Sequence, residues 1–334
     1  MLKKKNNKNI TLINAVSSMM LQIFTIISGF IIPKLILVTF GSEVNGLIAS
    51  FNQFFGYISL VEGGLTGVVM AKLYKPLVDK NNEKISSIVN TTKKFYNKLA
   101  VIFSLYTIIL AIVYPLIVKT NFSYMYVSTL GVILGIGLFI QYNFSLALRI
   151  LLNADKKVYI VSITQIFILF INLIMFILVI KIFPNIHILK LITALLYIIQ
   201  PIVYNKYIKQ HFDIDKNAKS DMELIKDRWD GFAISLAAFI HNNTDVIILT
   251  LFTDLKMVSV YSVYSLVTSG LRQIIKAFSA GIVPSLGNIY AKGNSDELKK
   301  AFDFYEYIVL LLTFFLFSVG GILITPFVLL YTTN

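Results

Sequence analysis

The sequence predicts an all-α protein that crosses a membrane several times. Of its 334 residues, 57% are hydrophobic and only 14% are charged, whereas a soluble domain carries about 25% charged residues. Apolar runs of about 20 residues or more recur along the whole chain, and each can cross a hydrocarbon core of about 30 Å as a helix. The net charge of +13 is then first of all a topology signal, and not a sign of nucleic-acid binding.

Nine apolar segments qualify as membrane spans. The N-terminus is basic and then apolar, as in a signal peptide, but its apolar run continues for about 27 residues with no small-residue cleavage site. We therefore expect it to stay as the first span. The expected spans are 12–38, 44–71, 98–118, 124–148, 158–181, 186–206, 230–253, 257–284 and 304–330.

The connections between these spans alternate in charge, which predicts their orientation. With the N-terminus placed inside, the inner segments hold 23 of the 30 Lys and Arg, and the outer connections hold four: Lys119, Lys181, Lys190 and Lys256. Positive residues stay on the cytoplasmic side. The sequence therefore predicts a multi-pass protein with a cytoplasmic N-terminus.

The inner connections also predict the domain organisation. Residues 82–96 place apolar side chains at helical spacing, which favours an amphipathic helix on the inner membrane surface. A weak pattern occurs twice, at 72–96 and at 288–307. In each case a Leu-Tyr or Ile-Tyr pair is followed by an Asn/Asp-rich turn and then by a Lys-rich helix. This pattern makes the second span equivalent to the eighth. We expect a six-helix bundle at 1–206, a cytoplasmic linker at 207–228, and an incomplete three-helix bundle at 229–334.

Two cations one turn apart are the first candidates for a binding site. Arg272 and Lys276 lie in the stretch SLVTSGLRQIIKAFSAG of the eighth span. Counted from Lys256 at about 1.5 Å per residue, they lie roughly 24 and 30 Å deep. Lys276 either reaches the inner headgroups or faces a wet cavity, and we take Arg272 as the stronger candidate for contact with substrate.

An acidic residue in the second span is the candidate counter-charge. Glu62 is followed by Gly63, Gly64 and Gly67, which favours a distorted or closely approached helix. In the repeat alignment it lies at the depth of Lys276, so we expect it to pair with Arg272 or Lys276 in at least one conformation. The alternative is a purely structural ion pair.

Three further ionisable residues lie within spans. Asp245, with His241 one turn earlier, forms the most polar patch of the seventh span. It is either a proton or cation relay or a cluster of hydrogen bonds between helices. Lys34 follows Pro33 near the outer end of the first span, where it either binds substrate or reaches the headgroups.

Several stretches resemble bacterial polysaccharide flippases. The run VTFGSEVNGLIASFNQFFGYISLVEGGLTGVVMAKLYKPLVDKNNEKISSIV (38–89) is similar to the N-terminal region of Wzx-type oligosaccharide-lipid exporters of the MOP superfamily. Further similar stretches are 243–267, 282–294 and 325–331. The resemblance implies a two-bundle, MATE-like transporter fold with twelve to fourteen helices, so we expect the C-terminal helices to be missing here.

The resemblance also implies a function. Such proteins move undecaprenyl-pyrophosphate-linked oligosaccharide across the bacterial cytoplasmic membrane by alternating access, for capsule, O-antigen or exopolysaccharide synthesis. Expected partners are this lipid-linked oligosaccharide, membrane lipid, a coupling proton or sodium ion, and polysaccharide assembly proteins. Arg272, Lys276 and Lys34 would then contact substrate, while Glu62, Asp245 and His241 would serve ion coupling or charge pairing.

Two other functions compete with this one. A MATE-like multidrug exporter of cationic drugs calls for an acidic cavity, but the cations within the spans outnumber the carboxylates. A membrane-embedded oligosaccharide polymerase or ligase needs reactive groups on a sizeable outer loop, and every outer connection is short. The sequence has no Cys, and its three His are scattered. We therefore expect no metal site, no cofactor and no enzymatic activity.

Overall fold

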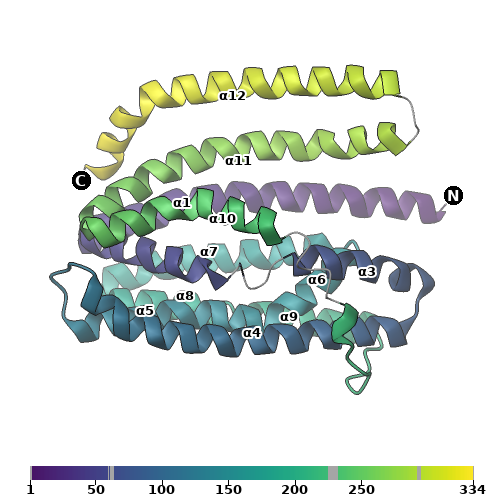
Figure 1. Ribbon diagram of the computed structural model, residues 1–334, viewed down its shortest axis with the longest axis horizontal. Helices are drawn as coiled ribbons and strands as arrows, with labels where there is room; N and C mark the ends of the chain where they lie inside the picture. The colour runs from purple at the N-terminus through teal and green to yellow at the C-terminus, as the bar shows by residue number, and fades with distance from the viewer. Residues whose placement is uncertain (1, 59, 61–63, 225–231, 292–294, 334) are drawn as a thin grey trace.

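A computed structural model describes residues 2–58, 60, 64–224, 232–291 and 295–333. These residues form helices and turns, with no strand among them, and the long helices lie side by side (Figure 1). The helices are α1 (Leu2–Gly56), α3 (Leu65–Asp79), α4 (Asn82–Ile117), α5 (Tyr124–Ile140), the π-helix η1 (Gln141–Ser145), α6 (Leu146–Ala154), α7 (Val158–Ile182), α8 (Ile186–Leu196), α9 (Ile199–His211), α10 (Phe232–Phe252), α11 (Leu255–Ala291) and α12 (Ser295–Thr332).

Within the described residues, six helices are long and apolar enough to cross a membrane. They are Leu12–Gly56, Asn82–Ile117, Tyr124–Ala154, Val158–Ile182, Ile186–His211 and Ser295–Thr332. Much of their apolar surface faces outward; on α12, for example, Phe314, Ile322 and Leu330 are each 77% exposed. Helices satisfy their own backbone hydrogen bonds, so such surfaces suit a lipid environment. The chain is an all-α, multi-pass membrane protein.

The chain reverses its direction inside α1, at Gly41. This glycine has φ 84° and ψ 171°, a backbone conformation that residues with a β-carbon rarely adopt. The first part of α1 runs from the N-terminus to this turn, and the second part returns beside it (Figure 1). The connection expected between residues 38 and 44 is therefore present, and a single glycine provides it.

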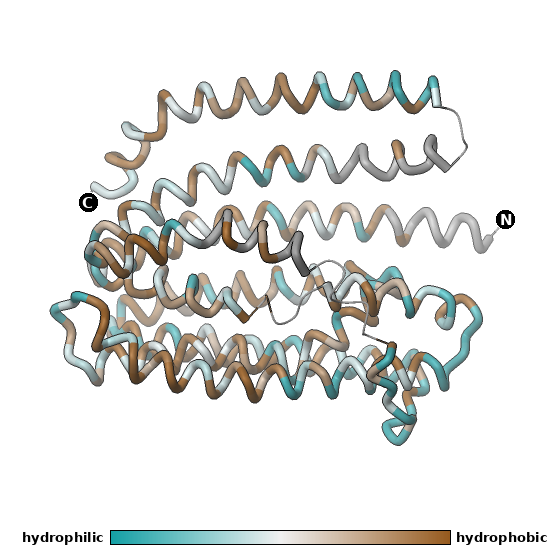
Figure 2. The backbone as a smooth tube through the Cα atoms, viewed as in Figure 1, coloured by the Kyte–Doolittle hydropathy of each residue, from teal (hydrophilic) through white to brown (hydrophobic). Residues whose placement is uncertain are grey.

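Hydrogen bonds identify which connections share an end of the molecule. Near the N-terminus, Asn14 Nδ2 donates to Lys156 O at 2.8 Å and Asn14 Oδ1 accepts from Tyr159 N at 2.9 Å. At the opposite end, Asn121 Nδ2 donates to Glu43 Oε1 at 3.1 Å. We call these the Lys156 end and the Glu43 end. Hydrophilic residues gather around the connections at both, as Figure 2 shows.

The amphipathic segment 82–96 does not lie on the membrane surface as a separate helix, and that prediction was wrong. It is the first part of α4, which continues unbroken to Ile117. Its apolar face packs inside the protein, where Ile85, Ile88, Val89 and Tyr96 are at most 5% exposed. An apolar stripe has the same sequence pattern whether it faces lipid or protein, and here α3 and α6 cover it.

The segment after α9 forms a strap across α4. Asn90 of α4 is 9% exposed, and its Nδ2 donates to the carbonyl oxygens of Asp215 at 2.9 Å, and of Lys216 and Ala218 at 3.2 Å. Thr91 Oγ1 also accepts from Asp221 N at 2.9 Å. Residues 212–224, within the expected linker, are therefore held in place by side chains of α4.

Replacing Asn90 should release this strap. We expect Asn90→Ala to make the peptide bonds after Lys216 and Lys219 cleavable by trypsin at least several times faster, because each lost hydrogen bond contributes about 1 kcal/mol. Limited proteolysis of the detergent-solubilised protein measures this rate. The control is Asn82→Ala, an exposed residue at the start of the same helix. Equal cleavage of both variants would show that Asn90 does not hold the strap.

An aromatic core fixes the second part of α1 against α4 and η1. Phe51 stacks on Tyr114 with ring centroids 4.3 Å apart, and Phe55 meets Phe103 edge-on at 5.5 Å. Phe103 in turn lies 5.9 Å from Tyr142 of η1. All five rings are buried. This core positions one wall of the cavity described below.

Candidate functional site

Helix α1 contacts the C-terminal helices α10 and α11 through buried polar side chains. Asn45 Nδ2 donates to Ser259 Oγ at 2.9 Å and to Ser262 Oγ at 3.1 Å. Thr250 Oγ1 of α10 donates to Ser50 Oγ at 2.9 Å. Such bonds between membrane helices contribute about 0.6 kcal/mol each on average. They fix the register of α1 against α10 and α11, and we call this contact the α1–α11 seam.

Arg272 and Lys276, the predicted substrate contacts, lie further along α11, about 15 and 21 Å from Ser262, where this helix contacts the first part of α1. Gln273, between them in sequence, forms a hydrogen bond with Gln22 of α1. Arg272 and Lys276 themselves are exposed. The structure therefore places both cations on an open part of α11, next to the face that packs on α1.

The predicted counter-charge, Glu62, lies outside the described residues. Of the second expected span, the structure describes α1 up to Gly56 and α3 from Leu65. The pairing of Glu62 with Arg272 or Lys276 thus stays a prediction.

Lys34 contacts an aromatic cluster between α1 and α12. Its Nζ lies 5.6 Å from the centre of the Tyr331 ring, a cation–π geometry. The Tyr331 hydroxyl donates to Phe30 O, and the Phe30 ring lies edge-on to Phe327. Lys34 is half-buried. These contacts favour an anchoring role, and its contact with substrate stays a prediction.

Asp245 is bound to the neighbouring helix. Its Oδ2 accepts a hydrogen bond from the Tyr261 hydroxyl of α11, which supports the alternative of a hydrogen-bond cluster between helices. The side chain of His241 lies outside the described residues, so the proposed relay stays a prediction. Within the described part of the chain, no group of three or more His, Asp or Glu side chains is placed to hold a metal ion.

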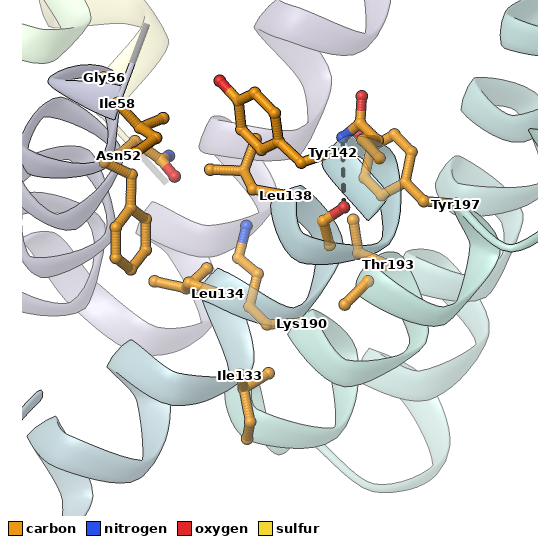
Figure 3. A pocket seen from close by; sticks show the side chains of 14 residues that line it. Asn52, Gly56, Ile58, Ile133, Leu134, Leu138, Tyr142, Lys190, Thr193 and Tyr197 are labelled. Atoms are coloured by element: carbon orange, nitrogen blue, oxygen red, sulfur yellow. Dashed lines mark hydrogen bonds between the residues drawn. The ribbon is translucent and has the colours of Figure 1, made fainter. Parts of the chain in front are cut away.

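The N-terminal helices line a cavity of about 390 Å³ that is partly open to the surroundings (Figure 3). Its walls come from the second part of α1, from α5 and η1, and from α8. The lining residues are Asn52, Phe55, Gly56, Ile58, Ile133, Leu134, Gly137, Leu138, Gln141, Tyr142, Lys190, Thr193, Ala194 and Tyr197. The π-turn of η1 places both Gln141 and Tyr142 in the wall, and such turns are frequent at functional sites.

Lys190 is the charged residue of this lining. Its side chain extends from α8 into the cavity, toward Leu134 and Leu138 (Figure 3). The Nζ atom lies 5.4 Å from the centre of the Phe176 ring. The same lining includes the amide side chains of Asn52 and Gln141. A cation beside amide groups suits an anion or a chain of waters.

The cavity lies within the thickness of the membrane. Lys190 is four residues from the start of α8, or about 6 Å from the Glu43 end. Gln141 is 17 residues from the start of α5, or about 25 Å from the same end. The cavity thus reaches from near the Glu43 end of the helices to beyond their middle. An ionisable group at such a depth is a functional candidate by default.

Lys190 was not among the predicted site residues. Its position near the start of a span indicated a lysine of the outer connection. The missed signal is the stripe formed with Thr193 and Tyr197, three and seven residues later, which lies on one face of a helix. All three side chains line the cavity.

Comparison with known proteins does not place this chain in a family. No protein-family model matches it, and no curated protein matches it in sequence. The resemblance to Wzx-type flippases, carried by 38–89 and the three shorter stretches, therefore stays a prediction.

Proposed function

We propose that this protein is a flippase that moves a polyprenyl-pyrophosphate-linked oligosaccharide across the bacterial cytoplasmic membrane. It would do so by alternating access between two helix bundles of a MOP-type fold, with nine spans in this chain and the N-terminus in the cytoplasm. The observation that carries the proposal is the exposure of Arg272 and Lys276 on α11, one helical turn apart and next to the Gln273–Gln22 contact with the first part of α1.

The chemistry of these cations fits a pyrophosphate. Arg presents a planar fork of donors that pairs with phosphate oxygens in bidentate fashion, and Lys adds a mobile positive charge. The cavity around Lys190 adds a third cation, and its described lining holds no carboxylate. An anionic lipid-linked substrate fits these groups better than the cationic drugs of a multidrug exporter do.

The proposed coupling uses the acidic residues. A proton or sodium ion at Glu62, or at Asp245 with His241, would change the local charge and shift the balance between the two conformations. Tyr261, which donates to Asp245 from the neighbouring helix, links that carboxylate to α11. Polysaccharide assembly proteins are the further partners in this proposal.

Complementation of a flippase-deficient strain tests the function. We expect the protein to restore polysaccharide export, and Arg272→Ala to lower the rate about tenfold or more, because a charged hydrogen bond contributes about 1.5–3 kcal/mol. Arg272→Lys should keep part of the activity. Lys256→Ala, which removes an exposed cation at the other end of α11, is the control, with protein levels in the membrane matched by immunoblot.

Two results would count against the proposal. Failure of the wild-type protein to restore export, despite correct insertion, would contradict the flippase function itself. Full activity of Arg272→Ala would instead remove this residue from the mechanism.

A further inference from the structure

Four lysines gather around a second cavity, at the Lys156 end. This cavity of about 520 Å³ lies between α4 and the strap 212–224. Its lining residues are Asn90, Lys93, Lys94, Asn97, Lys216, Asn217, Ala218, Lys219 and Ser220. We call it the lysine pocket. Its described lining includes no acidic residue, so it presents a concentrated positive charge.

The fold holds these lysines together although their charges repel. Lys93 and Lys216 oppose each other electrostatically, yet the strap is fixed by Asn90, and Lys94 Nζ donates to Ser220 Oγ at 2.6 Å. The nearest carboxylates of the strap are engaged locally, since Asp215 Oδ1 accepts from Asn217 N at 2.8 Å. A bound anion would relieve this repulsion.

The depth of the lysine pocket matches the headgroup layer. From Ile117, at the Glu43 end of α4, to Lys94 the helix rises about 34 Å over 23 residues. This rise is close to one hydrocarbon thickness. Toward the membrane centre, α4 exposes Val101, Ile102 and Leu105, which are 68%, 52% and 62% exposed. The charged pocket thus continues into an apolar helix face that acyl chains can cover.

We propose that the lysine pocket binds the phosphate headgroup of an anionic membrane phospholipid, whose acyl chains lie along the exposed face of α4. Basic pockets between membrane helices are a recurrent mode of recognition of anionic lipids. The adjoining apolar face favours a lipid over a free phosphate. Because Lys93 and Lys94 come from α4 and Lys216 and Lys219 from the strap, the lipid would clamp the strap onto the N-terminal helices. This inference does not depend on the flippase function.

Native mass spectrometry of the detergent-solubilised protein tests this site. The probes are phosphatidylglycerol and phosphatidylcholine with the same acyl chains. We expect phosphatidylglycerol to bind in preference, and Lys93→Gln/Lys216→Gln/Lys219→Gln to weaken its binding about 100-fold, since each lysine near an anionic surface contributes about a factor of five. The corresponding triple Arg variant should bind like wild type.

A matched variant controls for the general loss of charge. Lys256→Gln/Lys299→Gln/Lys300→Gln removes three exposed lysines elsewhere and should leave lipid binding unchanged. Equal binding of phosphatidylglycerol by the pocket variant and wild type, at equal helix content by circular dichroism, would overturn the proposal. Competition by glycerol phosphate as strong as that by phosphatidylglycerol would also overturn it, because the ligand would then be a soluble phosphate.

Discussion

Replacing Gly46 with alanine should separate α1 from α11 and cause a large loss of stability. A β-carbon at this position would lie 1.8 Å from Leu255 O and 2.8 Å from Leu255 C. Both are backbone atoms at the start of α11, so no side-chain rotation relieves the clash. We expect Gly46→Ala to cost about 3 kcal/mol, the upper part of the usual range for overpacking. Thermal unfolding in detergent, monitored by size-exclusion chromatography of samples heated to successive temperatures, measures this loss of stability.

Gly29 provides the matched control for this prediction. It lies in the first part of the same helix, and a β-carbon there meets no atom within 4 Å. Gly29→Ala should change the free energy of unfolding by less than about 1 kcal/mol, or stabilise the protein slightly, because alanine favours helix. If Gly46→Ala and Gly29→Ala unfolded at the same temperature, the close approach of α1 and α11 would be wrong.

The close approach also bears on the proposed flippase function. Asn45, next to Gly46, donates to two serines of α11, so the glycine brings the helices together and the amide fixes their register. In an alternating-access mechanism this seam would have to remain closed or break as a unit, because its polar bonds and its close packing lie at the same point. Gly46→Ala should therefore reduce polysaccharide export as well as stability.

The sequence predicted helix boundaries well where the length of the apolar run and the N-cap residue determine them. The span expected at 158–181 is α7, Val158–Ile182, and the start expected at 124 is the start of α5. There, Ser123 accepts from Tyr126 N at 3.3 Å as an N-cap. The sequence did not predict that residues 82–117 form one continuous helix. An amphipathic stripe at 82–96 has the same pattern on the membrane surface as against other helices, so the pattern did not show that this segment extends the span.

The candidate site was less predictable for a related reason. Depth along a span can be counted from the sequence, and this singled out Arg272. The direction of a side chain depends on which helices pack around it, and this determines that Lys190 enters a cavity while Lys34 lies against the Tyr331 ring. Only the stripe of Lys190 with Thr193 gave a local signal, and polar stripes also occur at helix–helix contacts.

Lys190→Met should raise stability and lower export. The lysine is half-buried in a membrane cavity, and no carboxylate of the described lining neutralises it. A charge at the centre of a membrane helix costs about 3 kcal/mol and one nearer the end costs less, whereas methionine fills a similar volume without that cost. We therefore expect the variant to unfold at a higher temperature, by about 1 kcal/mol or more.

Export should change in the opposite direction. If the cation of Lys190 attracts the anionic substrate, Lys190→Met should reduce export at least tenfold at equal protein levels. Lys181→Met, an exposed lysine at the end of α7, should change neither property. A stable Lys190→Met variant with wild-type export would show that the cavity cation serves no transport step. A less stable variant would show that the ammonium has a structural role, because removing a group that contributes to folding destabilises the protein. Removing a group that is kept for function at the expense of stability does not destabilise it.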